Sequence, residues 1–347
     1  MEHTDYGFLP IEYYFVHDMC LRFHDFIVED IGSDRFAEKS KRDFKVDTST
    51  PPAEGEDVLD WLEKHGQGEL VNEVLSYELI RGLLSDFCNF VLSALRAVSK
   101  MKIAVAFALM RKPFLETLLL VEQLLCDEKT FMKSFALSSD NFDPTSIPKE
   151  RKQHIISICI EQLSHKEMYD AERIYQLRFD KAKTESLFCM TNMANHLITT
   201  RHPTFTTVKQ NLNLVFLHDE DYAANLDYIY FYIPYILHYA VEVIETLLVR
   251  KGILTDEEFK NRQLIRFIGV MLFMEQSKFI ETKAENPFDV LSANLKETCQ
   301  TCEKENTIYK SDFFSYYENE FFTCKHCMTP MTFENSTLQE LYKVLNI

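Results

Sequence analysis

The segment "IAVAFALMRKPFLETLLLVEQLL", residues 103–125, decides the fold that we expect for this chain. Apolar side chains lie on nearly all sides of the helix that it would form, a pattern typical of a helix buried at the centre of a protein. Only four of its side chains are charged: Arg111, Lys112, Glu116 and Glu122. We therefore expect a multi-helix bundle built around this central segment.

Long helical patterns precede and follow the central segment. Residues 68–100 place apolar side chains three and four positions apart, and residues 10–30 carry an aromatic stripe. Residues 219–252 are typical of one long helix, which we expect Pro234 to kink. The expected fold class is therefore mainly α.

The chain is expected to divide into a large helical domain, residues 1–290, and a C-terminal module, residues 291–347. Within the first, residues 31–56 are polar and contain proline, which predicts a loop. Thr255 and Glu258 have the spacing of a capping box and predict the start of a further helix. In the C-terminal module we expect a zinc ribbon and a terminal helix.

The balance of charge limits the partners that we expect. The chain has 54 acidic against 37 basic residues, a net charge of −17 with histidine neutral. Because nucleic-acid affinity comes mostly from cationic side chains that neutralise phosphates, no broad DNA-binding surface is expected. The same negative charge disfavours binding to anionic membrane surfaces.

The sequence predicts a cytoplasmic protein. Its first residues lack the basic region and the small-residue cleavage site of a signal peptide. The most apolar long stretch, residues 228–249, contains His238, Glu242 and Glu245, which favour a buried helix over a membrane span. Five cysteines stand singly in apolar surroundings, as buried thiols do in a reducing compartment.

Two Cys-x-x-Cys pairs near the C-terminus predict a metal site. The pairs, Cys299 with Cys302 and Cys324 with Cys327, are separated by 21 residues. Zinc binds four thiolates in a tetrahedron, and each pair supplies two sulfurs at a suitable separation. We expect one structural zinc per chain in a small ribbon, with strands formed by the aromatic-rich residues 307–324.

The expected zinc site has the features of a structural centre. Four thiolates fill the coordination shell, so no position remains for a substrate or a catalytic water. Residues 291–347 contain five lysines against eight acidic residues, a balance that repels phosphate. Glu303 and Met328 stand where zinc knuckles usually carry glycine. We therefore expect this module to shape the protein or to contact a protein partner.

The charges inside the central segment form the first candidate site outside the cysteines. A buried charge is costly unless it is paired, so each should have a partner. Lys112 and Glu116 are four residues apart, which suits an ion pair on one helix face, although Pro113 disturbs the turn between them. A structural ion pair is one interpretation. The other is a polar ligand pocket that includes Arg111, Lys112 and Glu116.

A second candidate site lies in "ANHLITTRHPTF", residues 194–205. Asn195, His196, Arg201 and His202 follow one another closely where a helix is expected to end. Such side chains can bind an anion or supply general acid and base catalysis. Alternatively, the histidines simply interact favourably with the dipole at the C-terminus of a helix.

Three passages resemble bacterial all-helical proteins: "AFALMRKPFLETLLLVEQLL", "MANHLITTRHPT", and "QNLNLVF" with the long helix after it. Over residues 70–250 the chain is similar, at a distance, to the HEPN-type helical bundles of toxin and phage-defence systems. HEPN ribonucleases carry an Arg, four to six further residues and then a His on one helix. No Arg of this chain has that spacing. Asn195 with His202, and Asn211 with His218, match a degenerate form.

Three functions remain open on this basis. The first is a structural or regulatory component of a defence or toxin-type system that works through a protein partner or self-association. The second is a metal-independent HEPN-like ribonuclease that acts on RNA through His202, His196 and Arg201. The third is a ligand-binding helical bundle whose polar pocket contains Arg111 and Glu116.

Overall fold

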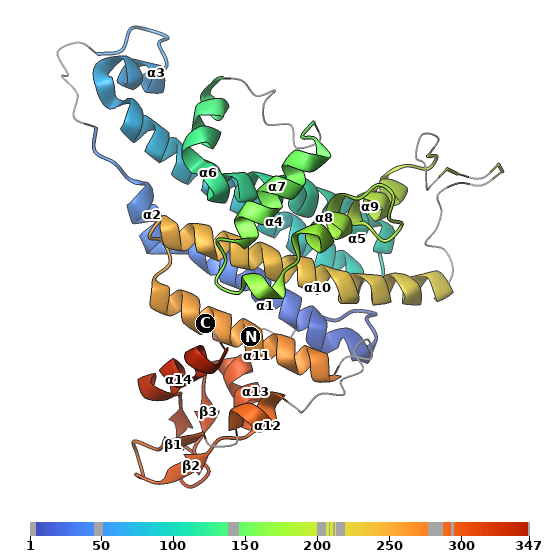
Figure 1. Cartoon of the computed structure of the whole chain (residues 1–347), viewed down its shortest axis with the longest axis vertical. Coiled ribbons are helices and arrows are strands. Elements are labelled where there is room, and N and C mark those ends of the chain that lie inside the picture. Colours follow the sequence, from blue (N-terminus) through green and yellow to red (C-terminus); the bar gives the residue numbers. More distant parts are fainter. Residues whose placement is uncertain are drawn as a thin grey trace. The chain divides into compact units, whose positions relative to one another are not determined.

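The computed structural model describes residues 5–44, 51–137, 146–199, 206–207, 209–210, 212, 219–276, 287–292 and 295–345. The chain is mainly α-helical, with small β-hairpins near its C-terminus (Figure 1). Its contacts divide it into two compact units, Met1–Leu254 and Thr255–Ile347. The mainly α fold class expected from the sequence is confirmed.

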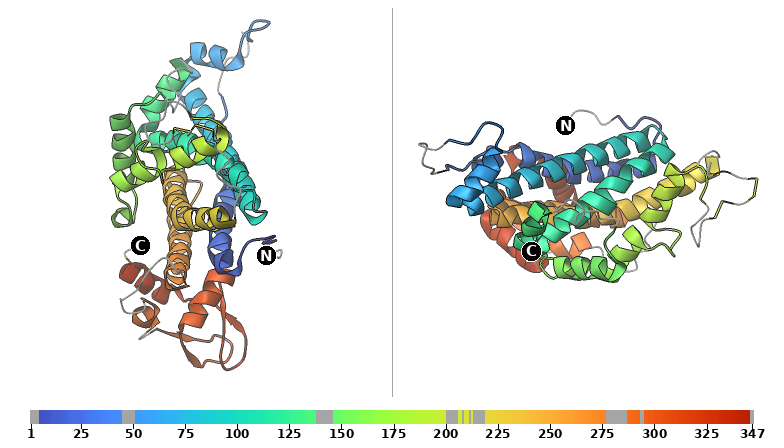
Figure 2. Two further views of the ribbon diagram at one scale, coloured as in Figure 1. Left: turned by 90° about the vertical axis from the view of Figure 1, so that its right-hand side faces the viewer. Right: turned by 90° about the horizontal axis from the view of Figure 1, so that it is seen from above.

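The first unit is a bundle of helices. They are α1 (Tyr14–Gly32), α2 (Asp34–Ser40), α3 (Val58–Leu62), α4 (Gly68–Ser99), α5 (Ile103–Arg111), α6 (Leu118–Leu137), α7 (Lys149–Ile160), α8 (Ala171–Phe179), α9 (Leu187–Asn195) and α10 (Asp219–Arg250). Helix α1 packs against both α4 and α10, and α5 packs against α4 and α9 (Figure 2). Helix α6 contacts α4, α7 and α10, so the second half of the central segment lies among three helices.

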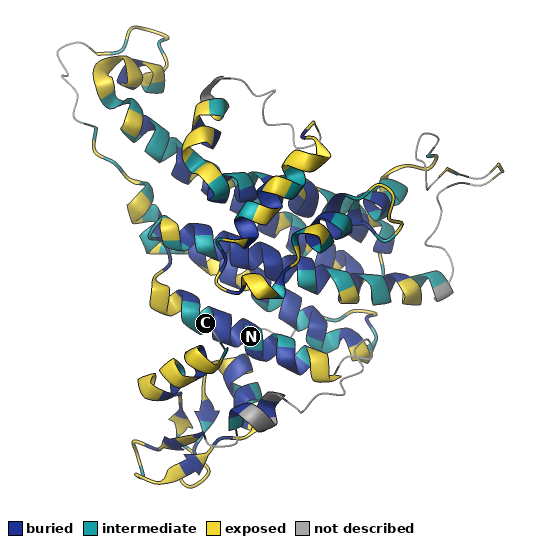
Figure 3. Cartoon of the chain, in the orientation of Figure 1, coloured by how far each residue is buried: buried dark blue, intermediate teal, exposed yellow. Residues whose placement is uncertain are grey.

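Helix α10 runs through the core of the first unit. Tyr230 and Ile236 on it are fully buried, and the middle of the helix is dark blue in Figure 3. By length and composition, Asp221–Arg250 would suit a membrane span, but 78% of its apolar window lies inside the protein. Glu242 and Glu245 are also fully buried here. In the described structure α10 is therefore a core helix.

The central segment continues through its proline instead of breaking. Pro113 has no N–H group, so the ordinary α-helical hydrogen bond cannot form at this position. The chain forms a wider π-helical turn, Lys112–Thr117, in which the Leu118 N–H donates to the Pro113 carbonyl five residues earlier. Helices α5 and α6 are thus joined by a turn with an altered residue spacing.

The polar segment 31–56, which was predicted to be a loop, contains helix α2. The Ser33 hydroxyl accepts a hydrogen bond from the Phe36 N–H at 3.1 Å and caps the first turn. Phe36 is fully buried, and the guanidinium of Arg81 lies 5.2 Å over its ring. One capping side chain and one buried aromatic ring therefore produce a helix within a polar stretch.

The second unit combines helices with two short hairpins. Its elements are α11 (Asp256–Gln276), α12 (Pro287–Ser292), β1 (Lys296–Thr298), β2 (Glu305–Thr307), α13 (Lys310–Asn319), β3 (Phe322–Thr323), β4 (Pro330–Met331) and α14 (Asn335–Leu345). Strands β1 and β2 pair antiparallel, as do β3 and β4. Helix α11 packs against α13 and α14, and the Thr255–Glu258 capping box begins it. The contacts place α11 with the cysteine-bearing module, whereas composition had placed the boundary near residue 290.

The prediction that residues 307–324 form strands is wrong for most of the segment, because α13 occupies its middle. The Asp312 carboxylate accepts a hydrogen bond from the Tyr309 N–H at 2.8 Å, which caps the helix. Phe313 and Tyr316 are buried at helical spacing and pack within the second unit. Capping and tertiary burial thus override the strand propensity of the aromatic residues.

Gly269 of α11 allows the ring of Tyr317 to lie against the helix. A Cβ atom at this position would be 2.6 Å from Tyr317 Cε2, which is too close for any stable contact. We predict that Gly269→Ala lowers the free energy of unfolding by about 1–3 kcal/mol, because Tyr317 or α13 must shift. Denaturant unfolding followed by circular dichroism measures this change.

Gly82→Ala is the matched control for this substitution. Gly82 is exposed in α4, and a Cβ there would have nothing within 4 Å. Alanine at this position should stabilise the first unit by roughly 0.5–1 kcal/mol, because glycine weakens a helix interior. A Gly269→Ala protein as stable as the unmodified one would contradict the described packing of α11 on α13.

Candidate metal centre and candidate ligand pocket

The four cysteines converge as the sequence predicted. The turn between β1 and β2 carries Cys299 and Cys302, and the turn between β3 and β4 carries Cys324 and Cys327. The sulfurs of Cys299 and Cys327 are 3.6 Å apart, those of Cys302 and Cys324 are 3.7 Å apart, and all four lie within 4.8 Å of one another. A tetrahedron of sulfurs around zinc, with bonds of about 2.3 Å, has edges of roughly 3.8 Å. The cluster therefore fits a tetrahedral metal ion.

The two cysteine turns have the same backbone geometry. In the first, the Glu303 N–H donates to the Cys299 carbonyl at 2.8 Å, and in the second the Met328 N–H donates to the Cys324 carbonyl at 3.0 Å. Glu303 has φ 58° and Met328 has φ 63°, the left-handed conformation that glycine adopts most easily. In both turns, the position that usually holds glycine is thus occupied by a non-glycine residue in a strained backbone conformation.

The surroundings of Cys324 favour its thiolate, the form that binds metal. Burial raises the pKa of this thiol, but hydrogen bonds from the backbone N–H groups of Cys327 and His326 and from the side chains of Asn306 and Cys327 together lower it to about 6. The His326 N–H lies 3.4 Å from the Cys324 sulfur. With four cysteine ligands, a bound metal would have no position left for substrate, so the arrangement suits a structural site.

A pocket of about 840 Å³ opens in the first unit beside the π-helical turn. Arg111 and Glu116 line this pocket. Lys112 lies elsewhere, with Nζ 2.9 Å from Asp86 Oδ1, so the predicted Lys112–Glu116 ion pair is wrong. Glu116 Oε1 instead lies 3.6 Å from Arg111 Nε. The wider turn at Pro113 explains the change, because it brings residues five apart onto one face.

The other residues that line the pocket belong to α7, α8 and α9 and to the segments just before α7 and between α8 and α9. Figure 1 shows where these three helices lie in the bundle. The start of α7 supplies Lys149 and Lys152, and the end of α8 supplies the buried rings of Tyr175 and Phe179. Phe188 of α9 is half-buried at the edge of the pocket. The pocket is therefore assembled from segments that are far apart in the chain.

Basic side chains predominate among the charged residues that line the pocket. Four are basic (Arg111, Lys149, Lys152 and Lys181) and two are acidic (Glu116 and Asp180), a surplus of two positive charges. The cations lie over aromatic rings. The ring-centroid distances are 5.3 Å for Lys149 and Tyr175, 5.0 Å for Lys152 and Phe179, 5.1 Å for Lys181 and Phe188, and 5.6 Å for Arg111 and Phe188.

The second candidate site lies partly outside the described residues. Asn195 and His196 are exposed at the C-terminal end of α9, where the His196 N–H donates to the Asn192 carbonyl at 3.0 Å. Arg201 and His202 lie outside the described residues. The predicted grouping of these four side chains therefore stays a prediction.

A buried ion pair, which the sequence analysis did not identify as such, holds three helices together. Arg178 of α8 and Glu122 of α6 are both fully buried, with Nη1 and Oε1 2.5 Å apart. Tyr239 of α10 donates its hydroxyl hydrogen to the same Glu122 oxygen at 2.7 Å. Arg178 Nε also donates to the Phe114 carbonyl, in the π-helical turn, at 2.8 Å. Arg178 stands four residues after the buried Ile174, a spacing that could have indicated its burial.

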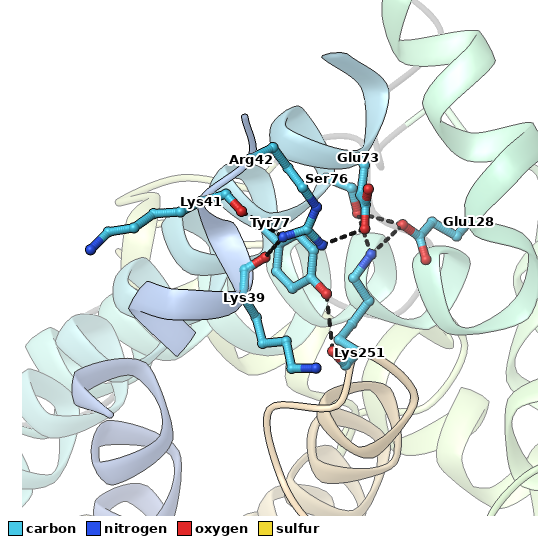
Figure 4. A network of polar contacts seen from close by, with 8 residues as sticks. All are labelled: Lys39, Lys41, Arg42, Glu73, Ser76, Tyr77, Glu128 and Lys251. Carbon is cyan, nitrogen blue, oxygen red and sulfur yellow. Dashed lines mark hydrogen bonds and ion pairs between the residues drawn. The ribbon is translucent and has the colours of Figure 1, made fainter. Parts of the chain in front are cut away.

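A second polar network joins α2, α4, α6 and the end of α10 (Figure 4). Lys251 Nζ lies 2.7 Å from Glu128 Oε1 and 3.2 Å from the Ser76 hydroxyl. Tyr77 donates to the Lys251 carbonyl at 3.0 Å. A Ser–Lys pair can be catalytic, but here both side chains bind the same carboxylate oxygen, because the Ser76 hydroxyl donates to Glu128 Oε1 at 2.5 Å. We interpret the network as a structural connection between helices.

The fold and the cysteine cluster define a mainly helical protein with four cysteines arranged to fit a metal ion. Comparisons with protein-family models, with curated proteins and with solved structures find no match for this chain. The HEPN-like resemblance therefore stays a prediction, and the function has to be inferred from the sites themselves.

Removing one member of the buried ion pair should strongly destabilise the first unit. Arg178→Ala leaves the Glu122 carboxylate buried without its cation, which typically costs about 3–5 kcal/mol. The double variant Arg178→Met with Glu122→Leu should recover most of this loss, because it removes both charges and fills the space. Urea denaturation measures the free energy of unfolding of the unmodified protein, of Arg178→Ala and of the double variant.

The control is Lys166→Ala, which removes an exposed ion pair with Glu161. We expect no measurable change in stability from it, since exposed pairs contribute little. If Arg178→Ala unfolded at the same urea concentration as Lys166→Ala, the buried pair would not have the role described here.

Proposed function

We propose that this protein binds an anionic ligand in the pocket of the first unit and that its cysteine centre holds one structural zinc. One observation carries the first part. A pocket with four basic and two acidic side chains occurs in a chain whose net charge is −17. In so acidic a chain, a local surplus of positive charge favours an anion that the rest of the molecule repels.

The aromatic rings also support this proposal, because a ring positions a cation without adding a negative charge to the pocket. A carboxylate partner would cancel the charge of a lysine, as Asp86 does for Lys112 outside the pocket. A ring face attracts the same ammonium through its quadrupole and carries no net charge. Lys149 and Lys152 each lie over such a ring.

Arg111 is held in place before any ligand arrives. Its Nη1 donates to Asn192 Oδ1 at 2.9 Å, its Nε lies 3.6 Å from Glu116, and its guanidinium lies over Phe188. A guanidinium has five N–H donors, so these contacts do not exhaust its capacity for hydrogen bonds. Because the side chain is already ordered, binding costs less conformational entropy.

We predict that pyrophosphate binds to the pocket and that the double variant Lys149→Gln with Lys152→Gln weakens this binding at least about tenfold. A hydrogen bond to a charged group contributes about 1.5–3 kcal/mol, and 1.4 kcal/mol corresponds to a factor of ten in affinity. Isothermal titration calorimetry at fixed ionic strength measures the dissociation constants.

The matched control is Lys129→Gln with Lys133→Gln. Both lysines are exposed on α6 and neither lines the pocket, so the change in net charge is the same. We expect this control to bind pyrophosphate within about twofold of the unmodified protein, because neither lysine lines the pocket where a ligand would bind. Equal losses in both double variants, or no saturable binding to the unmodified protein, would contradict an anion pocket.

The zinc part of the proposal is supported by the sulfur separations and by the closed set of ligands. We predict one zinc per chain by elemental analysis, and loss of structure in the second unit on chelation, because structural zinc contributes about 10–16 kcal/mol in small zinc modules. Cys299→Ser should lose most of the metal, whereas Cys88→Ser, an isolated buried thiol of the first unit, should keep it. A second unit that stays folded without metal would contradict this role.

The other two hypotheses stay predictions. The ribonuclease depends on Arg201 and His202, which lie outside the described residues. A component of a defence system that acts through a protein partner or self-association has no described observation in its favour.

A further inference from the structure

The volume of the pocket bears on the size of its ligand. Small-ligand pockets typically measure about 300–1,000 Å³, so 840 Å³ lies near the upper end of this range. A single phosphate would fill only a small part of it. The pocket also has apolar lining, including Leu115, Ile147 and Ala182. A matching ligand has an anionic part and a larger apolar or planar part.

Two carboxylates in the pocket narrow the class of ligand further. Glu116 and Asp180 line the same pocket as the four cations, and Glu116 is about one-third exposed. A fatty acid or an inorganic polyphosphate has no donor group with which to use these oxygens. Ribose hydroxyls and base amino groups are donors that carboxylates commonly accept from. The pocket therefore combines features that suit phosphates with features that suit a nucleoside.

Two groups of lining residues differ in a way that suggests an orientation. Lys149 and Lys152 belong to the first turn of α7, whose N-cap residue, Pro148, supplies no side-chain cap. The backbone N–H groups of this turn add to the two lysines as phosphate donors. The planar guanidinium of Arg111 and the half-buried ring of Phe188, which lie against each other, form the second group and offer planar surfaces to a base.

Resting on the anion-binding function proposed above, we propose that the ligand is a nucleoside di- or triphosphate. Its phosphates lie against Lys149 and Lys152, its base lies against Phe188 and Arg111, and Glu116 accepts a hydrogen bond from the nucleoside. The lysines then determine whether any phosphate binds, and Phe188 determines how much the nucleoside part adds to the affinity.

The test compares pyrophosphate, adenosine, and the four common ribonucleoside triphosphates by calorimetry on the full chain, with and without Mg²⁺. Stacking contributes about 1–3 kcal/mol per base, so at least one triphosphate should bind about tenfold or more tightly than pyrophosphate. Adenosine alone should bind more weakly than ATP. Phe188→Leu should remove the advantage of the triphosphate over pyrophosphate, whereas Phe188→Tyr should keep that advantage.

The outcomes separate this inference from the function on which it rests. If pyrophosphate binds as tightly as every triphosphate, the nucleoside part is wrong and the anion pocket remains. If Phe188→Leu weakens pyrophosphate and triphosphate equally while circular dichroism shows an intact fold, the assigned orientation is wrong. If neither pyrophosphate nor any triphosphate gives saturable binding, both proposals fall together.

Discussion

The buried ion pair between Arg178 and Glu122 is the constraint on which the arrangement of the first unit depends. Burying two charges away from solvent is tolerable only if they form an ion pair with good geometry. Helices α6 and α8 therefore have to pack so that Arg178 Nη1 and Glu122 Oε1 lie 2.5 Å apart. Tyr239 adds α10 to the same contact. Arg178 also reaches the Phe114 carbonyl, which fixes α8 against the π-helical turn. The position of one arginine thus orders four segments of the core.

The pocket follows from this constraint. Helix α8 carries Tyr175 and Phe179 just before and after Arg178, and the π-helical turn is flanked by Arg111 and carries Glu116. Because Arg178 ties the helix to the turn, it also sets the distance between these two walls of the pocket. The rings lie beside the lysines of α7 and carry no net charge themselves. A structural ion pair and a candidate binding site are therefore parts of one arrangement.

The two units reach stability by different physical means. The first has a large apolar core around α10, with polar networks at its inner contacts. The second is smaller, and its hairpins have only two or three residues per strand, too few to be stable by themselves. It combines packing of α13 and α14 on α11 with a cluster of four cysteines that fits a metal. A metal would stabilise the hairpins where the backbone hydrogen bonds are too few.

Local spacing in the sequence determined where the helices form, that the central segment is buried, and which four cysteines come together. Each of these depends on residues close together or on a ligand set with a fixed spacing. The sequence also required partners for the charges near Pro113, but only the tertiary structure decided that Lys112 pairs with Asp86 and that Arg178 pairs with Glu122. It likewise decided that α13 forms where strands were predicted and that Lys149, Lys152 and Lys181 join Arg111 around one pocket. The reason is that periodicity fixes which face of a helix is buried, whereas the contact of that face with a distant helix depends on how the whole bundle packs.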